Sequence, residues 1–387
     1  MKTSPLLERL SNKLAEREGS GLFRRLPQPE GAISVHPSPS PINCATNSYL
    51  GLHEDGWVAR EAAALTGGRL HGNLAARLVS ECTDLYGLLE REIAAWEGTE
   101  AALVFASGYA ANLGILQALC GRSTEIFCDW FNHASIYDGI KLAGSKLIRY
   151  RHGDMADLQH KLSSSRATEK LIVTDTVFSM DGDRAPLEDI AALARTHQAL
   201  VMVDEAHATG LFGEQGSGLV EATGTASAID LRMGTLSKAV AGLGGYVACS
   251  SLLRDGFVNF SRSFVYSTGL PPAALAYDLA AIRRIRQEPS MGATLLRAAA
   301  AFRDDLARLG FATGASSTQI VPCLVGSEEA ATQLALFLRK RGIGVPAIRP
   351  PTVPAGTSRV RFSWSRLLHD EHRAAIVSAL EAWKAGT

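Results

Sequence analysis

The sequence predicts an α/β fold in which a large doubly wound domain is followed by a smaller α+β domain at the C-terminus. Short apolar runs alternate with amphipathic stretches along a chain of 387 residues, of which 46% are hydrophobic and 20% charged. A chain of this size and composition can bury a large core. Alternating strands and helices predict parallel strands that are joined by right-handed crossovers, which is the doubly wound arrangement.

Four apolar runs are typical of strands that are covered on both faces. They are Ala101–Phe105, Leu171–Val177, Leu200–Asp204 and Tyr246–Ser250. Helices are predicted at Leu85–Trp96 and Asp189–His197, because charges gather on one side of each segment. Residues 101–121 carry no charge, but polar residues and a glycine interrupt them, so a buried strand that turns into a helix is favoured over a membrane span.

We expect three parts along the chain: an N-terminal arm at 1–46, a large domain at 47–270 and a C-terminal domain at 271–387. The Pro-rich stretch Pro37–Pro41 follows the helical arm. After Pro271-Pro272 the pattern changes to a long helical region rich in Ala and Arg. The last domain is then expected to contain a strand at Ile320–Val325, a helix at Glu328–Arg341 and a Pro-rich loop at Pro346–Pro354.

Charge and cysteine content limit the class of partner. The chain has 39 basic and 39 acidic residues, so nothing in its net charge favours nucleic acid or an anionic membrane, and small molecules are the expected partners. Its six cysteines form no CxxC pair and no signal peptide is recognised, which predicts a reduced, cytoplasmic protein. Neither a disulfide framework nor a metal site is predicted.

Polar residues that could carry chemistry follow two of the predicted strands. The run 201–207 ends in Asp204 and, three residues later, His207, at the strand end where open α/β sheets build ligand sites. Alone, this pair is better explained as a strand-end cap and a packed histidine. About thirty residues further on, Lys238 lies between hydroxyl residues and glycines, where its amine could form an imine with a phosphorylated aldehyde. A lone lysine here is more often a solvated loop residue.

Together the acid and the lysine point to one cofactor, pyridoxal 5'-phosphate (PLP). An acid beside the pyridine nitrogen keeps it protonated, and this allows the ring to accept electrons while a lysine holds the aldehyde as an imine. The segment Ser107–Asn112 opens the helix after the strand that ends at Phe105, and helix N-termini bind phosphate. Glycine at such a turn also has a purely structural explanation.

These segments resemble the α-oxoamine synthase family of PLP enzymes, in order and in approximate spacing. The matching segments are Ser107–Asn112, His133–Ser135, Val177–Asp183, Asp204–Gly210 and Gly234–Lys238. The resemblance runs from about Asn47 to the C-terminus. It implies fold type I, the aspartate-aminotransferase-like fold, and a reaction that condenses an amino acid with an acyl thioester and releases CO2. The loop Ala347–Thr357 resembles the version in members that use L-alanine and a pimeloyl thioester, delivered by CoA or a carrier protein, in biotin biosynthesis.

Four catalytic residues are implied by the resemblance. Lys238 would hold PLP and then act as the base that removes the α-proton of the amino acid. Asp204 would pair with the pyridine nitrogen, and His207 would hydrogen-bond the ring 3-oxygen. His133 would stack on the ring and contact the substrate, although a lone histidine here would be interpreted as a core residue.

Further binding residues follow from the same resemblance. Gly108, Tyr109 and Thr235 would surround the phosphate, and Ser179 would contact the cofactor. Arg349 would bind the amino-acid carboxylate, since a guanidinium fits it in two places; without the motif it would be interpreted as a surface arginine. The other substrate residues are expected to be Asn47, Thr352 and, at the acyl or CoA end, Arg24.

The family resemblance also implies a homodimer with shared active sites, in which Thr268 would reach the phosphate of the partner. One region departs from the family pattern, because Glu81 follows Arg77–Ser80 and Tyr86 stands where histidine is common. That departure bears on the acyl donor, so the alternative is an α-oxoamine synthase that uses another acyl thioester or amino acid to make a different α-amino ketone. A PLP-dependent transaminase, lyase or silent binding protein is a further alternative, and the set Lys238, Asp204 and His207 together with the Arg349 loop argues against it.

Overall fold

The computed structural model describes residues 4–20, 23, 42–68, 72–73, 75–79 and 83–386. By their internal contacts the residues form two units, Met1–Pro41 and Ile42–Thr387. The first unit contains helix α1 (Pro5–Gly19), which begins after Ser4, whose side chain accepts a hydrogen bond from the backbone N–H of Leu6. The predicted stretch Pro37–Pro41 lies outside the described residues. The sheets and the pockets all lie in the second unit.

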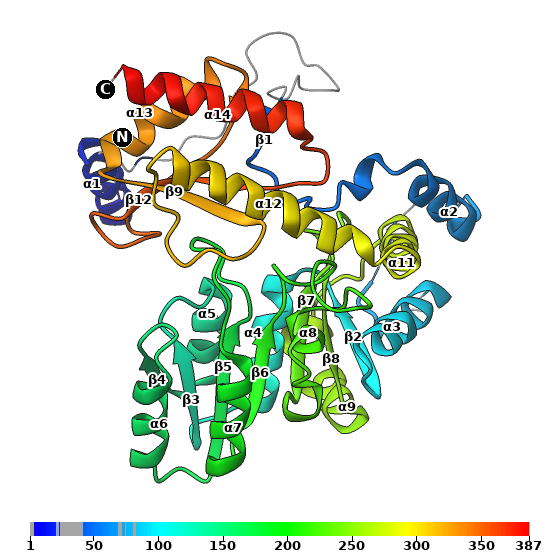
Figure 1. Ribbon diagram of the computed structural model, residues 1–387. Coiled ribbons are helices and arrows are strands. Elements are labelled where there is room, and N and C mark those ends of the chain that lie inside the picture. Colours follow the sequence, from blue (N-terminus) through cyan, green and yellow to red (C-terminus); the bar gives the residue numbers. More distant parts are fainter. Residues whose placement is uncertain are drawn as a thin grey trace. The chain divides into compact units, whose positions relative to one another are not determined.

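A seven-stranded sheet forms the centre of this unit (Figure 1). Its strands lie in the order β2-β8-β7-β6-β5-β3-β4. Their bounds are β2 (Ala101–Phe105), β3 (Thr124–Asp129), β4 (Lys146–Tyr150), β5 (Glu169–Asp175), β6 (Leu200–Asp204), β7 (Leu231–Thr235) and β8 (Gly245–Cys249). Strands β4, β3, β5, β6 and β7 are parallel, so their carboxyl ends lie at one edge of the sheet.

One strand contradicts the expectation of parallel pairing. Strand β8 runs antiparallel to both β7 and β2. The physical reason is the connection, because residues 236–244 return directly from β7 to β8 without a helix, whereas a parallel neighbour needs a crossover of a dozen or more residues. The loop that contains Lys238 is therefore a short connection between antiparallel neighbours, at the edge where the parallel strands end.

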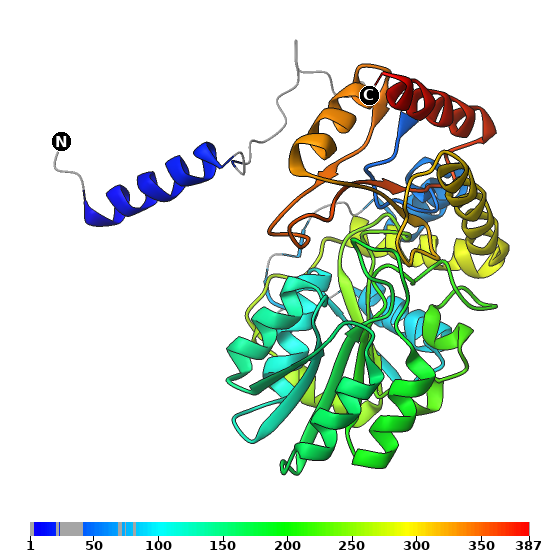
Figure 2. The ribbon, with the colours of Figure 1, turned by 60° about the vertical axis from the view of Figure 1, so that its left-hand side comes forward.

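Helices cover both faces of the sheet (Figure 2). Alternate residues of β2 show this: Leu103 and Phe105 pack on one face with α4, α5, α9 and α10, while Ala102 and Val104 pack on the other with α3, α6 and α7. The helices of this part are α2 (Gly56–Thr66), α3 (Asp84–Glu97), α4 (Gly108–Leu119), α5 (Ala134–Ala143), α6 (Met155–Ser164), α7 (Leu187–His197), α8 (Leu219–Ala222), α9 (Ser251–Phe260) and α10 (Arg262–Val265), with single 3-10 turns η1 (Leu52–Glu54) and η2 (Ala226–Ala228).

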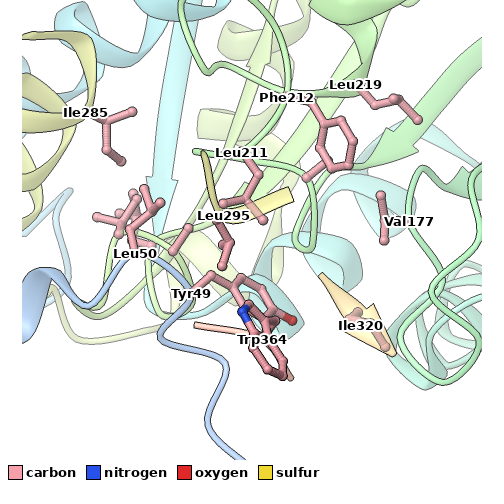
Figure 3. Close-up of a cluster of buried hydrophobic side chains, with 14 of the residues drawn as sticks. Tyr49, Leu50, Val177, Leu211, Phe212, Leu219, Ile285, Leu295, Ile320 and Trp364 are labelled. Carbon is pink, nitrogen blue, oxygen red and sulfur yellow. The ribbon is translucent and has the colours of Figure 1, made fainter. Parts of the chain in front are cut away.

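The C-terminal region adds a second, antiparallel sheet of order β11-β12-β9. Its elements are α11 (Pro272–Gln287), α12 (Ser290–Arg308), β9 (Ile320–Gly326), α13 (Glu328–Arg339), β11 (Ala347–Ile348), β12 (Ser358–Ser363) and α14 (Asp370–Ala385). A short parallel pair joins β1 (Ile42–Asn43) to β10 (Ile343–Gly344). One apolar cluster links the regions, since Tyr49, Leu211, Ile285 and Trp364 all belong to it (Figure 3).

The predicted elements are confirmed, with strand and helix ends that differ by a few residues. The predicted strand 171–177 is β5 at Glu169–Asp175, and the predicted helix 328–341 is α13 at Glu328–Arg339. The segment 101–121 is a strand followed by a helix, as expected. Within the described part of the chain, no helix has the length and apolar character that a membrane span requires.

Candidate active site

A pocket of about 260 Å³ lies where the parallel strands end. Asp204 is the last residue of β6, Thr235 is the last residue of β7, and Asp175 ends β5 directly opposite Asp204. The pocket brings together seven of the predicted residues, which are Gly108, Tyr109, His133, Asp204, His207, Thr235 and Lys238. These residues come from four separate segments, so the fold assembles them at the edge where doubly wound sheets bind ligands.

A chain of hydrogen bonds holds Lys238 in place. Its Nζ atom lies 2.9 Å from Nε2 of His207, and Nδ1 of His207 lies 2.6 Å from the hydroxyl of Tyr49. The Tyr49 hydroxyl also donates to Oδ1 of Asn47 at 3.1 Å. Asn47 is thus connected to the pocket through Tyr49 and His207, and both ring nitrogens of the histidine are used.

A second network orients Asp204. The amide of Asn112 donates to Oδ2 of Asp204 at 2.8 Å, and the backbone N–H of Ala206 donates to Oδ1 at 2.9 Å. The same amide donates to the hydroxyl of Ser135, which lies 2.7 Å from Nδ1 of His133. His133 and Asp204 are therefore positioned relative to each other by two neutral side chains.

Burial shifts the titration of the basic groups. It lowers the pKa of Lys238 to about 8, although the carboxylates of Asp204 and Asp175 oppose the change. Burial, followed by the nearby Lys238 and Arg361 cations, holds the pKa of His207 well below its usual range. Burial also lowers the pKa of His133. Near neutral pH both histidines are accordingly neutral, and the lysine amine is readily deprotonated.

The first turn of α4 and the loop after β7 form a cradle with polar groups. Ser107 caps the helix by accepting from the backbone N–H of Ala110, and the first N–H groups of a helix have no partner within it. The hydroxyls of Thr235 and Ser237 lie 2.9 Å apart on the same wall. A Cβ at Gly245 would lie 2.5 Å from the backbone of Gly108, so glycine is required where β8 passes the start of α4.

Two other predicted residues, Ser179 and Thr352, line a different pocket of about 480 Å³. Its walls are the turn Trp130–Asn132, the turn Phe178–Asp181 and the loop Pro351–Pro354. The backbone of the second wall is tied to the C-terminal sheet, since the carbonyl of Ser179 accepts from Nε of Arg361 at 2.5 Å. Ser179 was predicted to contact the cofactor, but here it lines this second pocket.

None of the remaining predicted residues that the structure describes lines either pocket. Arg349 directly follows β11, and its carbonyl accepts from the backbone N–H of Thr352 at 3.0 Å. Thr268 forms an isolated β-bridge with Ala76. Arg24 and Glu81 lie outside the described residues. Tyr86 packs under Arg77, whose guanidinium carbon is 3.7 Å from the ring centroid.

Sequence reasoning missed several residues that complete the site. Asp175 could have been found, because it lies near the end of the predicted strand 171–177, and it is the last residue of β5 as Asp204 is of β6. It is buried, and burial together with the Asp204 carboxylate raises its pKa well above the usual range. Ser135 belongs to the matching segment His133–Ser135 but was given no role. Tyr49 gave no signal, since nothing local shows that a fold will place a hydroxyl against a histidine from another segment.

The comparisons agree with this geometry. The aminotransferase class I and II family model matches residues 39–378. The chain belongs to this family. It is 48% identical over 325 residues to an 8-amino-7-oxononanoate synthase of Anaeromyxobacter dehalogenans, which covers 84% of the chain and 81% of the relative. It is 45% identical over 368 residues to an 8-amino-7-oxononanoate synthase of Geobacter sulfurreducens, with 94% of both covered.

Solved structures show the same fold. A serine palmitoyltransferase of Sphingomonas wittichii has a TM-score of 0.91 and 29% identity, with 99% of each chain covered. An 8-amino-7-oxononanoate synthase of Francisella tularensis has a TM-score of 0.76 and 25% identity, with 89% of this chain and 98% of that one covered. The chain is thus an α-oxoamine synthase of fold type I, a PLP-dependent acyltransferase, and the predicted family, fold class and cofactor are confirmed.

The residues of the smaller pocket fit PLP. A lysine with a lowered pKa lies beside a neutral histidine, an aspartate faces the same space, and a helix N-terminus with two hydroxyls forms another wall. This donor set offers an amine for an aldehyde, an acid for a pyridine nitrogen and N–H and O–H groups for a phosphate. Within the described residues, no cluster of His, Cys, Asp and Glu is placed to bind a metal ion.

Proposed function

We propose that this enzyme condenses L-alanine with pimeloyl-CoA, or the corresponding carrier-protein thioester, to 8-amino-7-oxononanoate, CO2 and the free thiol in biotin biosynthesis. The observation that carries the proposal is the identity of 42–48% to relatives named 8-amino-7-oxononanoate synthase, over 81–98% of their lengths. Supporting it are the pocket around Lys238 and the larger pocket beside it, which offer space for a cofactor and for a long second substrate.

In this proposal the residues of the smaller pocket hold PLP. Lys238 would bind its aldehyde carbon, Asp204 would pair with its pyridine nitrogen, and His207 would hydrogen-bond the ring 3-oxygen. His133 packs on the ring, and its hydrogen bond with Ser135 sets the orientation of the imidazole. Gly108, Tyr109 and Thr235 surround the phosphate. When bound, PLP supplies an electron sink for the charge that develops at the α-carbon of alanine.

The remaining chemistry falls to side chains of this chain. Once the amino group of alanine has displaced it, the amine of Lys238 would remove the α-proton of alanine, and burial lowers the pKa of that amine to about 8. A carbon–carbon bond then forms between that α-carbon and the acyl carbonyl carbon, and the thiol leaves. CO2 departs afterwards and Lys238 returns a proton to the same carbon. Arg349 orients the alanine carboxylate, and Asn47 supports His207 through Tyr49.

The acyl donor is assigned to the larger pocket. Its lining combines aromatic and apolar side chains, among them Trp130, Phe131 and Val353, with the polar Ser179 and Thr352. Such a lining suits a mostly methylene chain. We further propose a homodimer in which Thr268 contributes to the partner's site, and Arg24 as a contact for the acyl or CoA end.

A second candidate is the same reaction with another acyl thioester or amino acid. The match to serine palmitoyltransferases, with a TM-score of 0.91, favours it as the alternative. Purified enzyme should therefore be assayed for CoA and CO2 release with alanine, glycine and serine against pimeloyl-CoA and octanoyl-CoA. We expect alanine and pimeloyl-CoA to be the best pair, and the gene to restore growth without biotin in cells that lack the synthase. Better turnover of octanoyl-CoA together with failed growth would contradict the biotin assignment.

A further inference from the structure

An ionic bridge centred on His152 lies behind the larger pocket. Nδ1 of His152 is 2.9 Å from Oδ1 of Asp129, and Nε2 is 2.8 Å from Oδ2 of Asp183. The two carboxylates come from different segments, because Asp129 ends β3 while Asp183 follows the turn after β5. The Asp129 side chain is 2% exposed, that of Asp183 13% and that of His152 23%, so solvent screens these contacts only in part.

The bridge has a positive centre. Burial alone would lower the pKa of His152, but its hydrogen bonds and ion pairs with Asp129 and Asp183 raise the pKa to about 10. The imidazole therefore carries a proton on both nitrogens over the physiological range and donates to both carboxylates. Charge-assisted hydrogen bonds of this kind are stronger than neutral ones.

The same ring packs against both aromatic walls of the pocket. It stacks on Phe131 with ring centroids 4.4 Å apart and an interplanar angle of 26°, and it meets Phe178 edge-on at 4.4 Å and 84°. Phe131 and Phe178 line the larger pocket, one from each of its first two walls. His152 thus contacts both walls through its ring and through its two nitrogens.

Backbone hydrogen bonds transmit the bridge to these walls. Oδ1 of Asp129 also accepts from the N–H of Phe131 at 2.8 Å, which shapes the turn that continues to His133. The carbonyl of Asp183 accepts from the N–H of Phe178 at 3.1 Å, which closes the other turn. The second turn is separately attached to the C-terminal region, because the N–H of Ser317 donates to Gly182 at 2.9 Å.

We infer that His152 is a positioning residue that fixes the distance between the Trp130–Asn132 and Phe178–Asp181 walls and thereby sets the affinity of the enzyme for its acyl donor. The inference rests on the proposed function, which assigns the acyl donor to this pocket. Asn132 ties one end of the first wall to β5, since it donates to the carbonyl of Val173 at 2.8 Å and accepts from the N–H of Asp175 at 2.9 Å. Without the bridge Phe131 and Phe178 lose their shared contact, so the width of the pocket between these two rings is no longer fixed. The residues around Lys238 keep their own hydrogen bonds.

The test compares His152→Gln with the wild-type holoenzyme, with pimeloyl-CoA as the probe. We expect KM for pimeloyl-CoA and its Kd measured by calorimetry without alanine to rise about tenfold or more, while KM for alanine and kcat at saturating donor change less than about twofold. His160→Gln makes the same change at an exposed position of α6 and should leave all four values unchanged.

A second variant distinguishes loss of the bridge from a general loss of folding. Asp183→Ala removes one half of the bridge and should raise the same two constants. Unchanged donor KM and Kd in both variants would overturn the inference, and so would a loss in which donor, alanine and cofactor affinities fall together with the melting temperature. If wild-type enzyme turns over octanoyl-CoA but not pimeloyl-CoA, the proposed donor is wrong. The variants are then compared with octanoyl-CoA, where the same selective rise supports the inference and its absence overturns it.

Discussion

Nζ of Lys238 lies 2.9 Å from Nε2 of His207, so the two basic groups are within hydrogen-bonding distance of each other. Burial lowers the pKa of both, to about 8 for the lysine and far below the usual range for the histidine. A neutral histidine can lie this close to an amine without charge repulsion. Burial, which lowers the pKa of Lys238, thus makes its neutral amine more available as a nucleophile and base near neutral pH.

The first prediction concerns the pH dependence of cofactor capture by the apoenzyme. Only the neutral amine of Lys238 attacks an aldehyde, so the rate should rise with pH as the amine loses its proton and level off above its pKa of about 8. Stopped-flow absorbance after mixing apoenzyme with PLP at pH 6 to 10 measures this rate. A rate that continues to rise in proportion to hydroxide up to pH 10 would indicate an unshifted lysine.

The second prediction is that Lys238→Ala loses the visible absorbance of lysine-bound PLP and at least about a thousandfold in turnover, while its far-UV circular dichroism stays the same. Lys141→Ala, at an exposed position of α5, is the matched control and should remain yellow and active. Activity retained in the Lys238 variant would remove this residue from its proposed role.

The third prediction addresses the acid at the end of β6. Asp204→Asn keeps the shape of the side chain and its contact with Asn112 but removes the negative charge. Exchange of the alanine α-proton in D2O, followed by NMR without acyl donor, should fall about a hundredfold or more while PLP remains bound. Asp189→Asn, on the exposed side of α7, should exchange at the wild-type rate. Equal rates in all three proteins would mean that another acid serves the ring nitrogen.

The sequence predicts much of this arrangement because the chemistry follows strand ends. The strand 200–204 predicts where Asp204 and His207 emerge, and both line the same pocket as Lys238. Contacts between distant segments were not predictable in this way. Tyr49 reaches His207 across 158 positions of the chain, and no local pattern records such a contact. The antiparallel direction of β8 was not predicted, because its apolar run has the same composition as that of a parallel strand. Only the short loop between β7 and β8 determines its direction.

The fourth prediction is a decline of stability with rising pH. Burial raises the pKa of Glu97 to about 8, although the Tyr246 hydroxyl donates to its Oε1 at 2.6 Å. Between the unfolded value of about 4.5 and 8 the native state therefore binds more protons than the unfolded state, and stability falls as pH rises through this window.

Glu97→Gln removes this titration, so the thermal midpoint of the variant should decline less than that of the wild type between pH 6 and 9. Calorimetry or circular dichroism at matched ionic strength measures the difference. Glu205, whose pKa burial raises to about 7, should maintain part of the slope. Glu188→Gln, which is exposed on α7, should follow the wild-type curve, and parallel curves for all three proteins would place the titration elsewhere.

The last prediction tests the assignment of Arg349 to the substrate carboxylate. Arg349 follows β11 at the start of the loop that contains Thr352, whose backbone N–H donates to the Arg349 carbonyl at 3.0 Å. Arg349→Lys keeps the positive charge but loses the planar fork that can bind both carboxylate oxygens. We expect KM for alanine to rise about tenfold or more, with KM for pimeloyl-CoA and the affinity for PLP nearly unchanged.

Arg339→Lys, at an exposed position of α13, makes the same exchange as a control. An Arg349→Lys enzyme with unchanged alanine KM would show that another group orients the carboxylate, whereas a rise in donor KM alone would move Arg349 to the acyl side of the site.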